Sequence, residues 1–172
     1  MDFNTQLNRN TLISWFPNLA TDTNFSLTSP CTPVYNCIAW AMGFTDRWVD
    51  HYAAPGHWWP NGVVKNDTCQ ALLSAFLSLD FEQTDDYNYD SKYDKVVLYG
   101  HKGKWRHASR ILEDNSEHSK FGEYWDGTHS FDIFQDETYG APYACMQRFA
   151  NSFDPQKHPL SGSIKILKKP IW

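Results

Sequence analysis

Residues 35–43 decide the fold, and they read Tyr-Asn-Cys-Ile-Ala-Trp-Ala-Met-Gly. Asn36 is a favourable N-cap for a helix, and Gly43 is a favourable residue for ending one. The residues between them are apolar on every side, which predicts a helix that is buried all round. Cys37 therefore stands at the first position of a short, buried helix.

The position of Cys37 suggests a nucleophile. A helix N-terminus presents unpaired N–H groups and the positive end of the helix dipole, and both lower the pKa of a thiol. The N–H group of Cys37 would supply one half of an oxyanion hole, and the side chain of Asn36 or a further backbone N–H the other half. The alternative is that Cys37 is a small core residue, which is common for a free cysteine.

A nucleophilic cysteine needs a histidine as its base. His107 lies in a predicted strand, which would hold its ring rigidly, and His129 is the second choice. If a turn follows that strand, the returning strand brings Ser119 beside His107, and Ser119 would orient the imidazole. Glu123 and Asp126 are the alternatives for that third role. We expect the remaining histidines in loops, turns or exposed segments; these are His51, His57, His101, His118 and His158.

The rest of the chain predicts helices first and antiparallel strands afterwards, which is the α+β pattern. A helix is predicted over residues 67–79, with Asp67 as N-cap and Gln70 completing a capping box. The predicted strands are 95–99, 105–112, 117–121 and 130–134, with 143–149 and 163–168 as the last candidates.

We expect one domain over the whole chain, since 172 residues are typical of a single domain. Residues 1–23 would form an N-terminal arm or short helix, residues 24–150 the core, and residues 151–172 a C-terminal extension.

Composition and charge exclude several classes of protein. Aromatic residues make up 16%, which excludes a disordered chain. The net charge of -5 argues against a nucleic-acid partner, whose phosphates select a basic surface. No run approaches the roughly 18 apolar residues of a membrane span, so we expect no membrane partner. The N-terminal residues show no secretion signal, and a cytoplasmic protein is expected, with leaderless secretion left open.

The Trp-rich stretch 48–60 favours a different function. Trp48, Tyr52, Trp58 and Trp59 would form an aromatic platform for a protein or glycan partner of a non-catalytic binding module. A loop folded over the core is the simpler interpretation of the same residues. A Cys2His2 metal site is a third hypothesis, although its spacing matches no regular zinc motif. Its ligands would be Cys31, Cys37, His51 and His57.

The order of these elements resembles the papain-like superfamily, which includes the NlpC-type peptidases and amidases. In that superfamily a cysteine begins a buried, Trp-containing helix, as Cys37 does here, and a histidine opens a strand as His-Ala, as in His107-Ala108. The resemblance implies a papain-like α+β fold with the cysteine helix packed on an antiparallel sheet. The papain-like glutamine of the oxyanion hole is replaced by Cys31, and the orienting Asn is absent.

The sequence also resembles a small family of uncharacterised bacterial domains. The shared features are Tyr-Asn-Cys-Ile-Ala-Trp-Ala, a Trp-Trp-Pro element, His-Ala, Ser-Lys-hydrophobic-Gly and Tyr139-Gly140. They span roughly residues 24–148, and that family carries no established activity.

From the papain-like resemblance we expect a thiol hydrolase acting on an amide, as a peptidase, amidase or deamidase. His107 would take the proton of Cys37, the thiolate would attack the carbonyl, and His107 would then protonate the leaving amine. Asn36, Trp58 and Trp59 would contact the oxyanion and the substrate. The expected partner is a peptide or protein substrate, with an inhibitor or immunity protein if the protein is a secreted effector or toxin. No cofactor and no metal are expected.

Overall fold

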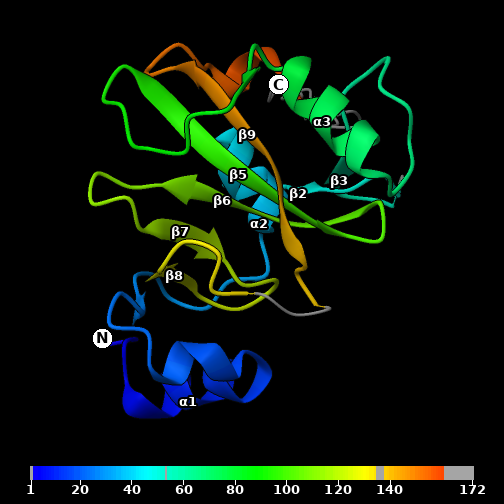
Figure 1. Cartoon of the computed structure of the whole chain (residues 1–172). Coiled ribbons are helices and arrows are strands. Elements are labelled where there is room, and N and C mark those ends of the chain that lie inside the picture. Colours follow the sequence, from blue (N-terminus) through cyan, green and yellow to red (C-terminus); the bar gives the residue numbers. More distant parts are fainter. Residues whose placement is uncertain (1, 53, 135–137, 161–172) are drawn as a thin grey trace, which may run out of the picture.

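The computed structural model describes residues 2–52, 54–134 and 138–160, which form a mixed α+β fold with a mostly antiparallel sheet (Figure 1). The helices are α1 (Gln6–Trp15), η1 (Pro17–Ala20), α2 (Cys37–Met42), α3 (Cys69–Leu77) and η2 (Pro155–Lys157). The strands are β1 (Ser26–Leu27), β2 (Trp48–Val49), β3 (His57–Trp58), β4 (Glu82–Thr84), β5 (Tyr93–His101), β6 (Lys104–Ile111), β7 (Glu117–Lys120), β8 (Asp126–His129) and β9 (Ala141–Phe149). The expected α+β class is confirmed.

The main sheet has seven strands in the order β1-β8-β7-β6-β5-β9-β4. The hairpin of β5 and β6 lies at its centre, and its turn is made by Lys102 and Gly103, both with positive φ. Such a turn follows the right-handed twist of the two strands, which explains why the chain reverses here. Strands β2 and β3 form a separate, two-stranded parallel sheet.

The two faces of the main sheet carry different cores. The largest cluster contains α2, α3 and the side chains of Leu98 and Ala108 from the central hairpin. The opposite face carries Val97 and Tyr99. A third cluster joins α1 and η1 to residues after β7 and β8, including Phe121 and Phe134. Figure 1 shows α1 beneath the β7–β8 edge, away from α2 and α3.

Helix α2 forms as its sequence predicts. The Asn36 side chain accepts a hydrogen bond from the backbone N–H of Ala39, and Gly43 ends the helix in the left-handed conformation. Five of the six helical residues are buried, and Trp40 is the half-buried exception. The helix packs chiefly on β6 and β7, and this contact places Cys37 against the sheet.

Three secondary-structure predictions need correction. Helix α3 is capped by Thr68 rather than Asp67, because Thr68 Oγ1 accepts from Ala71 N while Asp67 pairs with Lys104 at 2.6 Å. The strand expected at 130–134 ends earlier, as β8 (Asp126–His129), and a turn follows it. Strand β4 is missing from the predicted strands. The strand expected at 163–168 lies outside the described residues.

Candidate functional site

The sheet separates Cys37 from His107. Successive residues of a strand point to opposite faces, and Ala108 points into the cluster that holds α2. His107 therefore points to the other face, where its ring lies 5.8 Å from Tyr99, its cross-strand neighbour, and stacks on Tyr139 at 3.9 Å. No hydrogen bond joins the Cys37 sulfur to the His107 ring. The expected Cys37–His107 pair is wrong, because alternation along β6 places the two groups on opposite sides.

The environment of Cys37 also opposes an activated thiolate. The residue is buried, and this burial raises the pKa of its thiol to about 11, although backbone N–H groups at the helix start and at Ala108, and the charge of Lys120, act in the other direction. The expectation of a lowered pKa is wrong, because desolvation outweighs the helix N-terminus.

Alkylation distinguishes the two cysteines near the start of α2. We expect iodoacetamide at pH 8 to modify the exposed Cys31 at least roughly tenfold faster than Cys37, which is buried and largely protonated at that pH. Peptide mass spectrometry over a time course gives the two rates. Faster modification of Cys37 than of Cys31 would contradict this expectation and support an activated thiolate at Cys37.

Asn36 is a structural residue rather than an oxyanion donor. Its Oδ1 accepts from the N–H groups of Ala39 and Val49, and its Nδ2 donates to Val49 O at 2.9 Å. These bonds tie the start of α2 to β2. The side chain is buried and one of its two Nδ2 N–H groups is bonded to Val49 O, so the geometry supports a structural role and gives no support to the expected oxyanion role.

The structure does bring His107 and Ser119 together, as expected, on the face away from Cys37. His107 Nε2 lies 2.8 Å from Ser119 Oγ, and the same hydroxyl lies 2.7 Å from His129 Nε2. All three side chains are fully buried. Burial lowers the pKa of both imidazoles, that of His129 to about 4, so both rings are neutral at pH 7.

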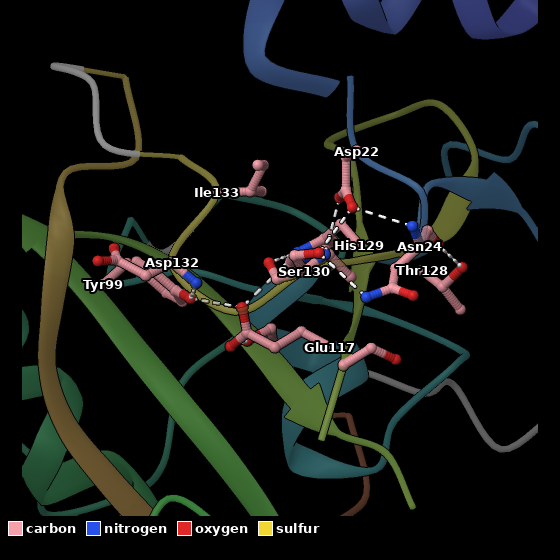
Figure 2. A network of polar contacts seen from close by, with 12 residues as sticks. Asp22, Asn24, Tyr99, Glu117, Thr128, His129, Ser130, Asp132 and Ile133 are labelled. Atoms are coloured by element: carbon pink, nitrogen blue, oxygen red, sulfur yellow. Dashed lines mark hydrogen bonds and ion pairs between the residues drawn. The ribbon is translucent and has the colours of Figure 1, made fainter. Parts of the chain in front are cut away.

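Glu117 extends this group to a buried carboxyl (Figure 2). It accepts hydrogen bonds from Tyr99 OH and Ser109 Oγ, both at 2.5 Å, and its Oε2 lies 3.6 Å from His129 Nδ1. Burial raises the pKa of Glu117 to about 7 despite these donors. We call His107, Ser119, His129 and Glu117 the buried relay.

The alternatives for the orienting residue lie elsewhere. Glu123 is exposed. Asp126 accepts a hydrogen bond from Tyr35 OH at 2.6 Å, and its charge acts on Lys120, which lies near Cys37. His118, expected to be exposed, is half-buried and packs its ring edge-on to Trp40.

The Trp-rich segment forms a pocket of about 290 Å³. We call it the tryptophan pocket, and the lining residues that matter below are Asp50, His51, His57, Trp58, Trp59 and Lys65. Two of these side chains stand against further rings: His57 stacks on Trp48 at 5.8 Å, and Trp59 stacks on Trp105 at 6.4 Å. The expected substrate contacts Trp58 and Trp59 thus line a real pocket.

Two buried nitrogens of the tryptophan pocket have no hydrogen-bond partner within the described part of the chain, and these are Trp59 Nε1 and His57 Nδ1. His51 Nδ1 lies 3.2 Å from Asp50 Oδ1, but the contact is not aligned as a hydrogen bond. A bound metal does not account for the missing hydrogen-bond partners of these nitrogens. Across residues 2–52, 54–134 and 138–160, no three His, Cys, Asp or Glu side chains are grouped so as to hold one, so the Cys2His2 hypothesis finds no support.

Comparison with known proteins gives a family but no activity. The model of a domain of unknown function, DUF7689, matches residues 26–147, which is more than two thirds of the chain. The chain belongs to the DUF7689 family. Among curated proteins and among solved structures no match is found. The DUF7689 match covers α2, the buried relay and the tryptophan pocket. In the described part of this DUF7689 chain, no helix has the length and apolar character to cross a membrane.

Sequence reasoning missed Glu117 as a member of a buried cluster and Tyr139 as the ring that stacks on His107. The signal available was strand β7 itself, which reads Glu-His-Ser-Lys and contains no apolar residue. A strand of this composition next to a central hairpin is buried only when its polar groups bind one another.

Proposed function

We propose that this domain is a binding module whose ligand-binding site is the tryptophan pocket and whose ligand is a neutral saccharide. The observation that supports it is a pocket with aromatic walls and two buried nitrogens that lack partners. Ligand pockets in proteins combine apolar and aromatic walls with a few polar groups that fix orientation.

The aromatic walls suit a ring-shaped ligand. Trp59 stacks on Trp105 and His57 stacks on Trp48, so these rings form part of the wall in the free domain. Tyr52 is two thirds exposed at the same segment and adds an accessible ring. A pyranose ring presents C–H groups that pack against such faces while its hydroxyl groups remain free to bond.

The unpaired nitrogens favour a ligand with many hydroxyl groups. A buried donor or acceptor without a partner costs about 1–3 kcal/mol, and a ligand that supplies the partner recovers that cost. Neither Trp59 Nε1 nor His57 Nδ1 is exposed in the free domain, so a hydroxyl group reaches them after a side-chain adjustment.

The charges of the pocket favour a neutral ligand. Asp50 and Lys65 carry opposite formal charges and both line the pocket. A phosphate or carboxylate ligand would meet the Asp50 carboxylate, and a cationic ligand would meet the Lys65 ammonium. A neutral polyol accepts from Lys65 and donates to Asp50.

Substitution of Trp59 by Phe tests the proposal. We expect wild-type protein to bind at least one member of a panel of neutral mono- and disaccharides by isothermal titration calorimetry. Trp59→Phe keeps a ring at the pocket but removes the N–H, and we expect affinity to fall about tenfold, which corresponds to one hydrogen bond.

The matched control is Trp125→Phe, because Trp125 packs in the cluster near α1 and does not line the pocket. It should leave affinity unchanged. Absence of binding across the whole panel, or equal loss in both variants, would reject the proposal.

The papain-like assignment is retained as a proposal for the fold, and it is supported by α2 packed on an antiparallel sheet. The amide-hydrolase activity expected with it has no support in this geometry, because Cys37 and His107 occupy opposite faces.

A further inference from the structure

We propose that Ser119 is the nucleophile of a second, closed site that transfers the acyl group of an ester with a short apolar acyl chain. This inference is independent of the tryptophan pocket. The inference rests on the hydrogen bonds of Ser119 and on a nearby apolar pocket. A layer of aromatic rings separates this pocket from Ser119.

The hydrogen bonds around Ser119 allow one arrangement of protons. His129 Nδ1 lies 3.0 Å from Ser130 O, which only accepts, so Nδ1 carries the proton of the neutral ring. His129 Nε2 is then an acceptor, and the Ser119 hydroxyl donates to it at 2.7 Å. Since that hydroxyl has one proton, His107 Nε2 must donate to Ser119 Oγ at 2.8 Å. Ser119 therefore faces a base on one side and a donor on the other.

Glu117 stands behind the base, with Oε2 3.6 Å from His129 Nδ1. The order serine, histidine, carboxyl is the one that activates serine nucleophiles on several unrelated folds. Here Ser130 O holds the tautomer of His129, while Glu117 is placed to stabilise the imidazolium that forms when the serine loses its proton. Figure 2 shows Glu117 reaching toward both Tyr99 and the His129–Ser130 segment.

An apolar pocket of about 230 Å³ lies on the outer side of the rings that cover the relay. Tyr139 lines it and stacks on His107 with nearly parallel planes, 7° apart. Phe121 also lines it and lies 6.1 Å from His129. The remaining apolar walls come from Trp15, Phe16 and Tyr124. Rings that line the pocket thus contact the two histidines bonded to Ser119.

The apolar lining selects the acyl part of the substrate. An alkyl chain in this pocket would bury apolar surface, whereas a charged or hydroxylated group would lose its hydration without gaining partners. Rotation of the Tyr139 ring off His107 would open this pocket toward the His107–Ser119 pair.

The reaction would proceed in two balanced steps. Ser119 Oγ bonds to the ester carbonyl carbon while its proton passes to His129 Nε2. The bond to the alkoxy oxygen then breaks, and that oxygen leaves as an alcohol with the proton from His129. In the second step water attacks the acyl-serine, His129 takes one water proton and returns it to Ser119 Oγ, and a carboxylic acid is released.

An alkyl fluorophosphonate tests the proposal, because it phosphonylates an activated serine with loss of fluoride and needs no known substrate. We expect Ser119 to be the modified residue by peptide mass spectrometry. Tyr139→Ala should raise the labelling rate at least tenfold by removing the ring over His107, and Tyr139→Leu, which keeps apolar bulk, is the second variant if the first does not fold. Ser119→Ala should abolish the labelling.

Two controls distinguish labelling of an activated Ser119 from labelling that follows a general loosening of the fold. Leu77→Ala removes an exposed apolar side chain on α3, outside this pocket, and should leave the rate within twofold of wild type. Ser109, a buried serine bonded to Glu117, should stay unmodified. If folded Tyr139 variants carry no label on Ser119, or label Ser109 equally, the proposal is overturned.

Discussion

Replacement of Gly140 by alanine is expected to destabilise the domain by about 3 kcal/mol or more. A Cβ atom at this position would lie 2.1 Å from the backbone oxygen of Gly100 in β5, and backbone cannot yield as a flexible side chain does. Gly140 also has φ of +77°, which an L-residue adopts at a cost. It begins the approach to β9, next to the Tyr139 ring that covers His107.

The matched control for this prediction is Gly103→Ala. Gly103 has the same φ of +77°, but an added Cβ would meet nothing within 4 Å. We expect it to cost about 1 kcal/mol from backbone strain alone. Urea denaturation of both variants gives the two free energies of unfolding. Equal decreases in the free energy of unfolding of the two variants would mean that the close approach of Gly140 to Gly100 does not affect stability.

Replacement of Glu117 by glutamine is expected to remove a pH dependence from the stability of the domain. The pKa of Glu117 is about 7 in the folded state, against 4.5 for an unperturbed glutamate. The folded state therefore keeps a proton that the unfolded state loses, and stability falls as pH rises from about 4.5 to about 7, then stays level. The difference between these pKa values corresponds to about 3 kcal/mol.

Glutamine cannot ionise, so the free energy of unfolding of Glu117→Gln, relative to wild type, should rise by about 3 kcal/mol between pH 4.5 and pH 8. Chemical denaturation at a series of pH values measures this difference, in which the titrating groups remote from Glu117 cancel. Glu123→Gln, which changes an exposed carboxylate, should show no such trend. A flat difference for Glu117→Gln would mean that the buried carboxyl is ionised without penalty.

Local structure follows from the sequence where one short signal acts alone. Asn36 and Gly43 bound α2 because a cap and a left-handed stop are properties of single residues. The turn between β5 and β6 follows equally from Lys102 and Gly103. At α3 two capping residues compete, and Thr68 prevails because Lys104 engages Asp67.

The candidate site was less predictable, because it depends on which face of the sheet each residue occupies. His107 and Ala108 are neighbours in sequence, and only the packing of α2 against Ala108 assigns His107 to the other side. The contact between His107 and Ser119 was predictable from the hairpin pairing of neighbouring strands. The link of His107 and Ser119 to Glu117 was not predictable from the sequence. Strand β7 is polar throughout, so it lacks the alternation of apolar and polar residues that shows a strand to be buried.

The most direct test of the proposed function is two-dimensional ¹H–¹⁵N NMR of the wild-type domain during titration with the saccharide panel. We predict that the indole N–H signal of Trp59 and the imidazole signals of His51 and His57 move with added ligand, while the amide signals of Cys37 and Ile38 stay in place. Movement confined to the start of α2, or no movement of the Trp59 indole with any saccharide, would contradict the assignment of the tryptophan pocket as the binding site.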